Sequence, residues 1–112
     1  MKKRIRNRCW IEINGEKFFG PGPAELLERI DKTGSVAKAA KAMDMSYKKA
    51  WDLVSELNAK GSKPYVLAHK GGKKGGGAEV TPAGMKVLSE YRKLTGKLDD
   101  ILSKHERLLS LI

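Results

Sequence analysis

The lysines of this chain are its strongest candidates for functional residues, and they form two informative groups. Lys48 and Lys49 follow Ser46 and Tyr47 in a stretch with helical spacing. A second set lies in or beside the glycine-rich stretch 71–77, namely Lys70, Lys73 and Lys74. Ammonium groups neutralise phosphates and donate hydrogen bonds to base edges. The positions of these lysines therefore predict a surface that binds a polyanion.

Groups suited to catalysis or metal binding are few. Cys9, His69 and His105 are too scattered for a zinc site with the usual ligand spacing. Asp99 and Asp100 are neighbours on an expected helix, so their carboxylates face different directions. We expect neither an enzyme nor a metal site, and no cofactor.

The overall charge supports a polyanionic partner. The 112 residues hold 23 Lys plus Arg against 13 Asp plus Glu, a formal net charge of +10. Such an excess favours nucleic acid among the polyanions. A single cysteine suits a reducing cytosol, and no apolar run is long enough for a membrane span. We therefore expect one cytoplasmic domain that does not bind membranes.

Residues 35–60 have the pattern of a helix-turn-helix. Ser35 and Ser46 are suited to cap two helices, about 35–43 and 46–60. Asp44 lies in the turn between them, where the backbone needs a positive φ that aspartate tolerates. Six small or apolar residues occupy the positions at which such helices bury side chains: Ala39, Ala40, Met43, Met45, Ala50 and Leu53.

Two further elements are expected before this motif. Apolar and polar residues alternate over 4–13, which predicts a half-buried strand. Asn14-Gly15 suits a type I′ turn, so a β-hairpin is expected over 4–20. Helical spacing over 23–32 predicts the first of three helices in 23–60, ended by Gly34.

Two short strands, 65–70 and 78–81, should flank the glycine-rich loop and form a wing over 65–81. The loop is not a phosphate-binding P-loop, because Lys74 is followed by glycine rather than serine or threonine. A surface loop without a ligand is the alternative to a DNA-contacting wing. His69 is equally compatible with a phosphate contact and with an ordinary surface position.

One long helix is expected over 82–112, and it carries an apolar seam. Seam residues step by alternating fours and threes, like heptad a and d positions: Val87, Tyr91, Leu94, Leu98, Ile101, His105, Leu108 and Ile112. A small domain already has its own core, so we expect the seam to face a second copy. His105 is interpreted as a tolerated polar residue there, with a pH-sensitive contact as the alternative.

The fold class that follows is mainly α with a small β component, a winged helix-turn-helix with an N-terminal hairpin and a C-terminal dimerisation helix. The residues expected to contact duplex DNA are Ser46, Tyr47, Lys48, Lys49, Asp52, Lys70, Lys73 and Lys74. Trp51 is assigned to core packing, whereas packing and DNA contact both remain open for Tyr47. The basic start of the chain, with five cations between residues 2 and 8, either extends this surface or is simply solvated.

The chain resembles the N-terminal DNA-binding domain of ModE-type molybdate-responsive transcription regulators. The likeness covers about residues 22–112 and is carried by the string Met45-Ser46-Tyr47-Lys48-Lys49-Ala50-Trp51-Asp52 and by the glycine-rich stretch that ends in Gly77-Ala78. The resemblance implies a winged helix that dimerises through its long terminal helix and N-terminal strand region and binds a palindromic operator. It also implies that residues 46–49 lie on the recognition helix and Lys73 and Lys74 on the wing.

This chain differs from the family pattern at two places. Asp44 replaces the usual glycine of the turn, and the chain stops at Ile112, before the molybdate-binding module. We expect a stand-alone regulator, a regulator whose effector module is in another protein, or a fragment; a link to molybdate or oxyanion metabolism is implied by resemblance only. The rival interpretation is a winged-helix module that binds RNA or protein without operator specificity. No effector is evident from the sequence.

Overall fold

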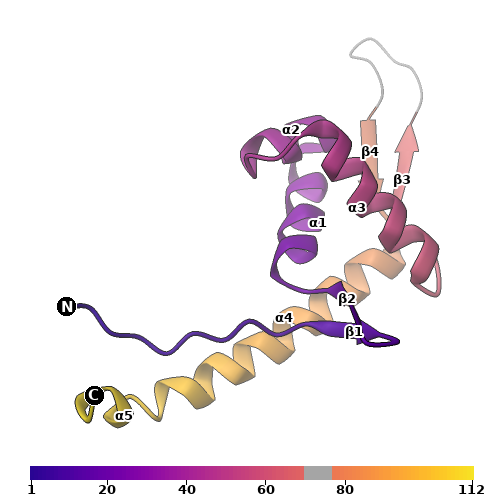
Figure 1. The fold of residues 1–112 in the computed structure, drawn as a ribbon. Helices are drawn as coiled ribbons and strands as arrows, with labels where there is room; N and C mark the ends of the chain where they lie inside the picture. Colours follow the sequence, from indigo (N-terminus) through magenta and orange to yellow (C-terminus); the bar gives the residue numbers. More distant parts are fainter. Residues whose placement is uncertain (70–76) are drawn as a thin grey trace.

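The computed structural model describes residues 1–69 and 77–112 and is mainly helical, with two small hairpins and one long helix (Figure 1). This arrangement matches the expected winged helix-turn-helix. The elements, in chain order, are β1 (Ile11–Ile13), β2 (Glu16–Phe19), α1 (Pro21–Thr33), α2 (Val36–Ala42), α3 (Tyr47–Lys60), β3 (Val66–His69), β4 (Gly77–Val80), α4 (Pro82–Ser103) and α5 (Arg107–Ser110). None of the helices in these ranges is long and apolar enough to cross a bilayer.

The first hairpin turns where the sequence predicts. Asn14 and Gly15 have φ values of 53° and 81°, as a type I′ turn requires, and Ile13 pairs with Glu16. The predicted strand over 4–13 is wrong in its extent, because β1 comprises only Ile11–Ile13. β2 has just four residues and the chain then turns at Gly20 into α1, so it offers no partner to residues 4–10.

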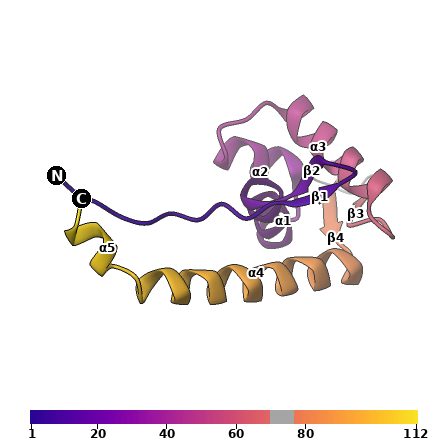
Figure 2. The same ribbon diagram turned by 60° about the horizontal axis from the view of Figure 1, so that its bottom comes forward.

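Residues 1–10 instead extend along the same side as α4, and the two chain ends lie near each other (Figure 2). The Tyr91 hydroxyl donates a hydrogen bond of 2.8 Å to the Cys9 carbonyl and fixes this segment to α4. Trp10 packs flat against Gly20, where an added Cβ would lie 2.3 Å from the indole ring. A glycine is therefore needed at position 20 for this contact.

Helices α1, α2 and α3 form a cluster around one core, and the predicted end and cap residues are confirmed. Gly34 ends α1 with a φ of 67°. Ser35 accepts a hydrogen bond from the Lys38 amide at 3.1 Å, and Ser46 accepts one from the Lys49 amide at 3.0 Å. Asp44 has a φ of 56°, so the turn has the expected left-handed residue without glycine. The most deeply buried side chains are Phe19, Leu26, Leu27, Ile30, Val54, Leu57 and Val66.

The second hairpin is tied to α3 by one side chain. β3 and β4 are antiparallel, with Val66 opposite Val80. The Asn58 carbonyl oxygen accepts hydrogen bonds from the backbone amides of Tyr65 (2.8 Å) and Val66 (3.1 Å), while its amide donates to the Val66 carbonyl at 2.9 Å. α3 and β3 are therefore held at a fixed distance and angle. The loop that joins β3 and β4 lies outside the described residues.

The predicted helix over 82–112 is wrong at its end. α4 stops at Ser103, whose hydroxyl donates to the Asp100 carbonyl at 2.7 Å and competes with the helical pattern. Amides beyond it bond three residues back, as from Lys104 to Ile101 at 3.1 Å, before the single turn of α5. The first half of α4 packs on the core, and its second half projects away from it (Figures 1 and 2).

Two glycines of α4 should respond oppositely to alanine. At Gly84 an added Cβ would lie 2.6 Å from the Tyr65 carbonyl oxygen and 2.8 Å from a Val80 methyl group, whereas at Gly96 it would meet nothing within 4 Å. We expect Gly84→Ala to lower the free energy of unfolding by about 1–3 kcal/mol through overpacking. Gly96→Ala should raise it by about 0.5–1 kcal/mol through helix propensity. Urea titration measures both; equal effects at the two sites would contradict the close packing of α4 on Tyr65.

Candidate nucleic-acid interface

The beginning of α3 lies at the surface because of the spacing of its apolar residues. Ala50, Val54 and Leu57 are buried and define the inner side of the helix. At 3.6 residues per turn, Lys48 and Asp52 then fall on the side farthest from the core. Their side chains are 86% and 66% exposed. No part of the described fold covers the start of this helix.

The aromatic pair at the start of α3 divides between core and surface. Trp51 is partly buried and packs against the core, as predicted. Tyr47 is 57% exposed, and its ring meets Trp51 edge to face, with centroids 6.3 Å apart and an interplanar angle of 75°. The sequence left Tyr47 open; the structure places it at the surface, held by a residue that is itself fixed.

Lys48 and Asp52 form an ion pair one turn apart. The Lys48 Nζ lies 2.9 Å from the Asp52 Oδ2. Because both side chains are largely solvated, this pair contributes little to folding, at most about 0.5 kcal/mol. It does fix an ammonium donor beside a carboxylate acceptor on the outermost side of α3.

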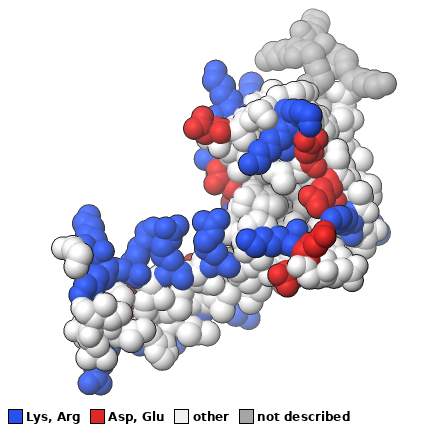
Figure 3. Space-filling view, in the orientation of Figure 1, with Lys and Arg blue, Asp and Glu red and all other residues white. Residues whose placement is uncertain are grey.

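Two basic residues of the same surface were missed by the sequence analysis. Lys38 and Lys41 lie exposed on α2, beside the start of α3. Figure 3 shows Lys and Arg side chains over this part of the molecule, interspersed with Asp and Glu, and a further row of Lys and Arg along the arm formed by the N-terminal segment and the second half of α4. The sequence holds nine lysines against three acids over 38–74, which could have signalled Lys38 and Lys41, but only the packing of α2 shows that both point outward. In helix-turn-helix proteins the first helix crosses the DNA backbone, where such lysines suit phosphates.

The far end of α3 has a different charge character. The Lys60 Nζ lies 2.9 Å from Glu56 and 3.6 Å from Glu16 of β2. The hydrogen bond with Glu56 is the main cause that raises the pKa of Lys60 above its usual value. Cations are thus matched by carboxylates here, and the unmatched positive charge of α3 is confined to its beginning.

Of the wing residues weighed as phosphate contacts, only His69 lies in the described part of the chain. Lys70, Lys73 and Lys74 lie outside the described residues. His69 ends β3, and its Nε2 lies 3.3 Å from Glu79 on β4. Its polar edge is therefore turned toward a carboxylate, which favours the surface interpretation of His69 over a phosphate contact. Within the described ranges, no group of three or more His, Cys, Asp or Glu residues could hold a metal ion.

Known proteins similar to this chain are regulators and molybdenum-related binding proteins. The chain is 43% identical over 101 residues to the molybdenum-pterin-binding protein MopB of Rhodobacter capsulatus (90% of this chain, 37% of that protein). It is 41% identical over 69 residues to the molybdenum transport protein ModE of Azotobacter vinelandii (62% and 26%). It is 33% identical over 101 residues to the DNA-binding transcriptional dual regulator ModE of Escherichia coli strain K12 (88% and 38%). This chain is homologous to the N-terminal region of ModE regulators and Mop proteins.

The resemblance stated from the sequence is thereby confirmed, although no family model matches the chain. The ModE and Mop relatives are regulators and binding proteins rather than enzymes, in agreement with the sequence analysis. The chain spans 26–38% of the length of the three relatives named above.

Only part of the predicted dimerisation seam is exposed at the surface of the structure. Tyr91 is 4% exposed and packs edge to face on Phe19, so its ring is used within its own chain. His105 and Leu108 lie beyond the end of α4 and are not in register with the rest of the seam. An apolar strip along α4 remains at the surface, made of Leu94 (43% exposed), Ile101 (53% exposed) and the half-buried Val87 and Leu98.

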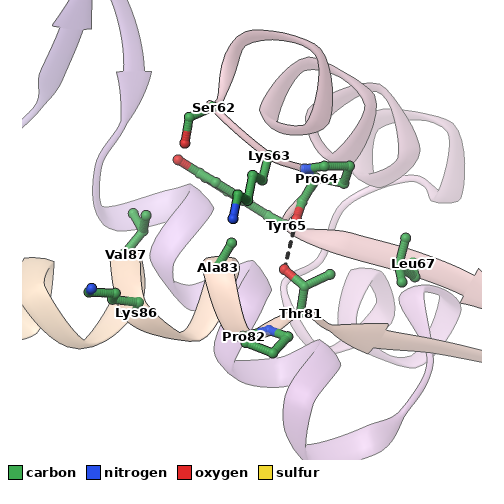
Figure 4. Close-up of a pocket in the computed structure, with 10 residues that line it drawn as sticks. All are labelled: Ser62, Lys63, Pro64, Tyr65, Leu67, Thr81, Pro82, Ala83, Lys86 and Val87. Atoms are coloured by element: carbon green, nitrogen blue, oxygen red, sulfur yellow. Dashed lines mark hydrogen bonds between the residues drawn. The ribbon is translucent and has the colours of Figure 1, made fainter.

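An open apolar groove lies where β3 and α4 begin (Figure 4). It has a volume of about 740 Å³ and includes the side chains of Tyr65, Leu67, Pro82 and Val87. Of the predicted DNA-contacting residues that the structure describes, none lines it, and Val87 connects it with the apolar strip on α4. The groove therefore belongs to the side of the molecule that carries the strip, not to the start of α3.

Proposed function

We propose that this protein is a sequence-specific DNA-binding transcription regulator that binds a palindromic operator as a homodimer. The observation that carries the proposal is the solvent-exposed beginning of α3, which bears Ser46, Tyr47, Lys48 and Lys49. A helix that enters the major groove contacts base edges with residues of its first turns, and these must be free of the protein's own fold. Homology to ModE regulators supports the same role.

The proposed contacts divide by chemistry. Tyr47, Lys48 and Asp52 would face base edges, while Lys38 and Lys41 of α2 and the wing lysines 70, 73 and 74 would neutralise backbone phosphates. Phosphate contacts give affinity and salt dependence, and base contacts give sequence preference. Because the relatives' names refer to molybdenum, genes of molybdenum transport and use are the first candidate targets.

A dimer would place two copies of α3 in successive major grooves, about 34–36 Å apart. The strip on α4 supports this arrangement, since exposed leucine and isoleucine side chains at helical spacing favour association with a like surface. Leu94 and Ile101, the two exposed members of the strip, lie in the half of α4 that projects away from the core.

Replacement of the lysines on α3 tests the DNA interface. We expect Lys48→Ala and Lys49→Ala each to weaken binding to a duplex selected from a random pool by about 5- to 100-fold. Fluorescence anisotropy with competitor RNA and heparin measures the effect. Lys97→Ala on α4 removes the same charge far from α3 and is the control. Equal competition by duplex DNA, RNA and heparin would instead favour an RNA-binding or interaction module.

Replacement of the wing lysines tests the phosphate contacts. Lys73→Ala with Lys74→Ala should reduce the slope of log K against log salt concentration by about 2, because two phosphate contacts are lost. Sequence preference should remain. An unchanged slope in binding titrations between 50 and 200 mM salt would remove the wing from the interface.

Charged residues in the α4 strip should abolish the dimer. Leu94→Glu with Ile101→Glu would place carboxylates in an apolar contact, and the protein should be monomeric at about 10 μM by size exclusion with light scattering. Ser89→Glu, on the other side of α4, is the matched control and should leave a dimer. A wild-type protein that is folded but monomeric would contradict the proposed assembly.

A further inference from the structure

We infer that the Lys48–Asp52 pair recognises a single G·C base pair in each half-site, and that Asp52 determines this specificity. The inference rests on the proposed function, because it requires α3 to enter a major groove. It assigns a base preference to one named pair of side chains.

The position of Asp52 is the first argument. It lies one turn into α3, on the side opposite Ala50, Val54 and Leu57, and its side chain is 66% exposed. A helix that enters the groove by its first turns brings this carboxylate close to the base edges. A negative group among phosphates is unfavourable unless a hydrogen-bond donor faces it.

The donor pattern of DNA narrows the choice of base. In the major groove only cytosine N4 and adenine N6 present amino donors, whereas guanine O6 and thymine O4 present acceptors that repel a carboxylate. Asp52 is therefore compatible with cytosine or adenine and opposes guanine or thymine at the base that it faces.

Lys48 resolves the remaining choice. Its Nζ lies 2.9 Å from the Asp52 Oδ2, so a donor and an acceptor are presented side by side. A G·C pair presents two adjacent acceptors, N7 and O6 of guanine, next to the N4 donor of cytosine, whereas an A·T pair places the N6 donor between two single acceptors, adenine N7 and thymine O4. An ammonium that contacts two acceptors beside a carboxylate that faces a donor therefore favours G·C. The ammonium retains further N–H groups, and the carboxylate has a second oxygen, so both can contact DNA while paired to each other.

The charges on the rest of α3 indicate that Asp52 has a distinct role. Glu56, the next acid along the helix, lies away from the outermost row and is paired with Lys60 at 2.9 Å. Glu56 and Asp52 thus each make an i,i+4 ion pair with a lysine at 2.9 Å, but only the Lys48–Asp52 pair lies on the outermost side of α3. This gives a matched control within one helix.

The test is selection of duplexes from a random pool by the wild-type protein, followed by titration of the selected duplex and of variants changed at one base pair. We expect a fixed G·C pair at the same position of both half-sites, and a loss of about tenfold or more when it becomes A·T. Asp52→Asn should reduce this discrimination to below about threefold and bind scrambled duplex more tightly. Glu56→Gln removes the same charge and should keep the wild-type preference.

The outcomes separate this inference from the proposed function. A wild-type protein that selects a palindrome and an Asp52→Asn variant with the same preference would overturn the role of Asp52 and leave the DNA-binding proposal standing. A fixed A·T pair that is lost in Asp52→Asn would overturn the assigned base pair. Failure of the wild-type protein to select any duplex would overturn both. Circular dichroism of Asp52→Asn should show the wild-type fold, since the pair is solvated.

Discussion

The contact between Asn58 and the start of β3 is the constraint that sets the geometry of the candidate nucleic-acid interface. One amide side chain binds two backbone amides and one carbonyl, at 2.8, 3.1 and 2.9 Å. A glutamine or a carboxylate could not satisfy all three groups in the same place. Because of this contact, the hairpin of β3 and β4 and the helix α3 move as one unit. The described part of β3 and the proposed base contacts of α3 therefore keep a fixed separation.

The second organising contact lies on the other side of the core. Tyr91 packs on Phe19 with ring centroids 5.1 Å apart, and its hydroxyl holds the Cys9 carbonyl. The burial of this ring raises the pKa of its hydroxyl further above neutral pH, where an ordinary tyrosine is already protonated and can donate. The first hairpin (β1 and β2), α4 and the N-terminal segment thus meet at Tyr91. Of the apolar strip on α4, Val87 precedes Tyr91, and Leu94, Leu98 and Ile101 follow it.

The sequence-based predictions are accurate where the type of a single residue decides the backbone conformation. The Asn14-Gly15 turn, the caps at Ser35 and Ser46, and the positive φ of Asp44 all follow from residue types alone. The errors arose where the conformation of a segment depends on its contacts with another part of the chain. Residues 4–10 alternate like a strand but have no strand to pair with, and a heptad pattern gave no sign that α4 ends at Ser103.

The candidate site shows the same division. The spacing of buried residues in α3 was sufficient to place Lys48 and Lys49 at the surface. Lys38, Lys41 and Asn58 could not be assigned, because their roles depend on how α2 and β3 lie against α3. Tyr91 was assigned to a second copy because its spacing fits a seam equally well whether its ring faces Phe19 or another chain.

The carboxylates at the far end of α3 have a consequence for approach to a duplex. Glu56 and Glu16 surround Lys60, whereas the first turn of the helix carries lysines and no acid. In the field of a phosphate backbone this asymmetry exerts a torque on the protein, which turns the lysine end inward and the acidic end outward. The molecule would thus be oriented before contact with the duplex. An orientation in which α3 lies flat along the groove would be electrostatically disfavoured.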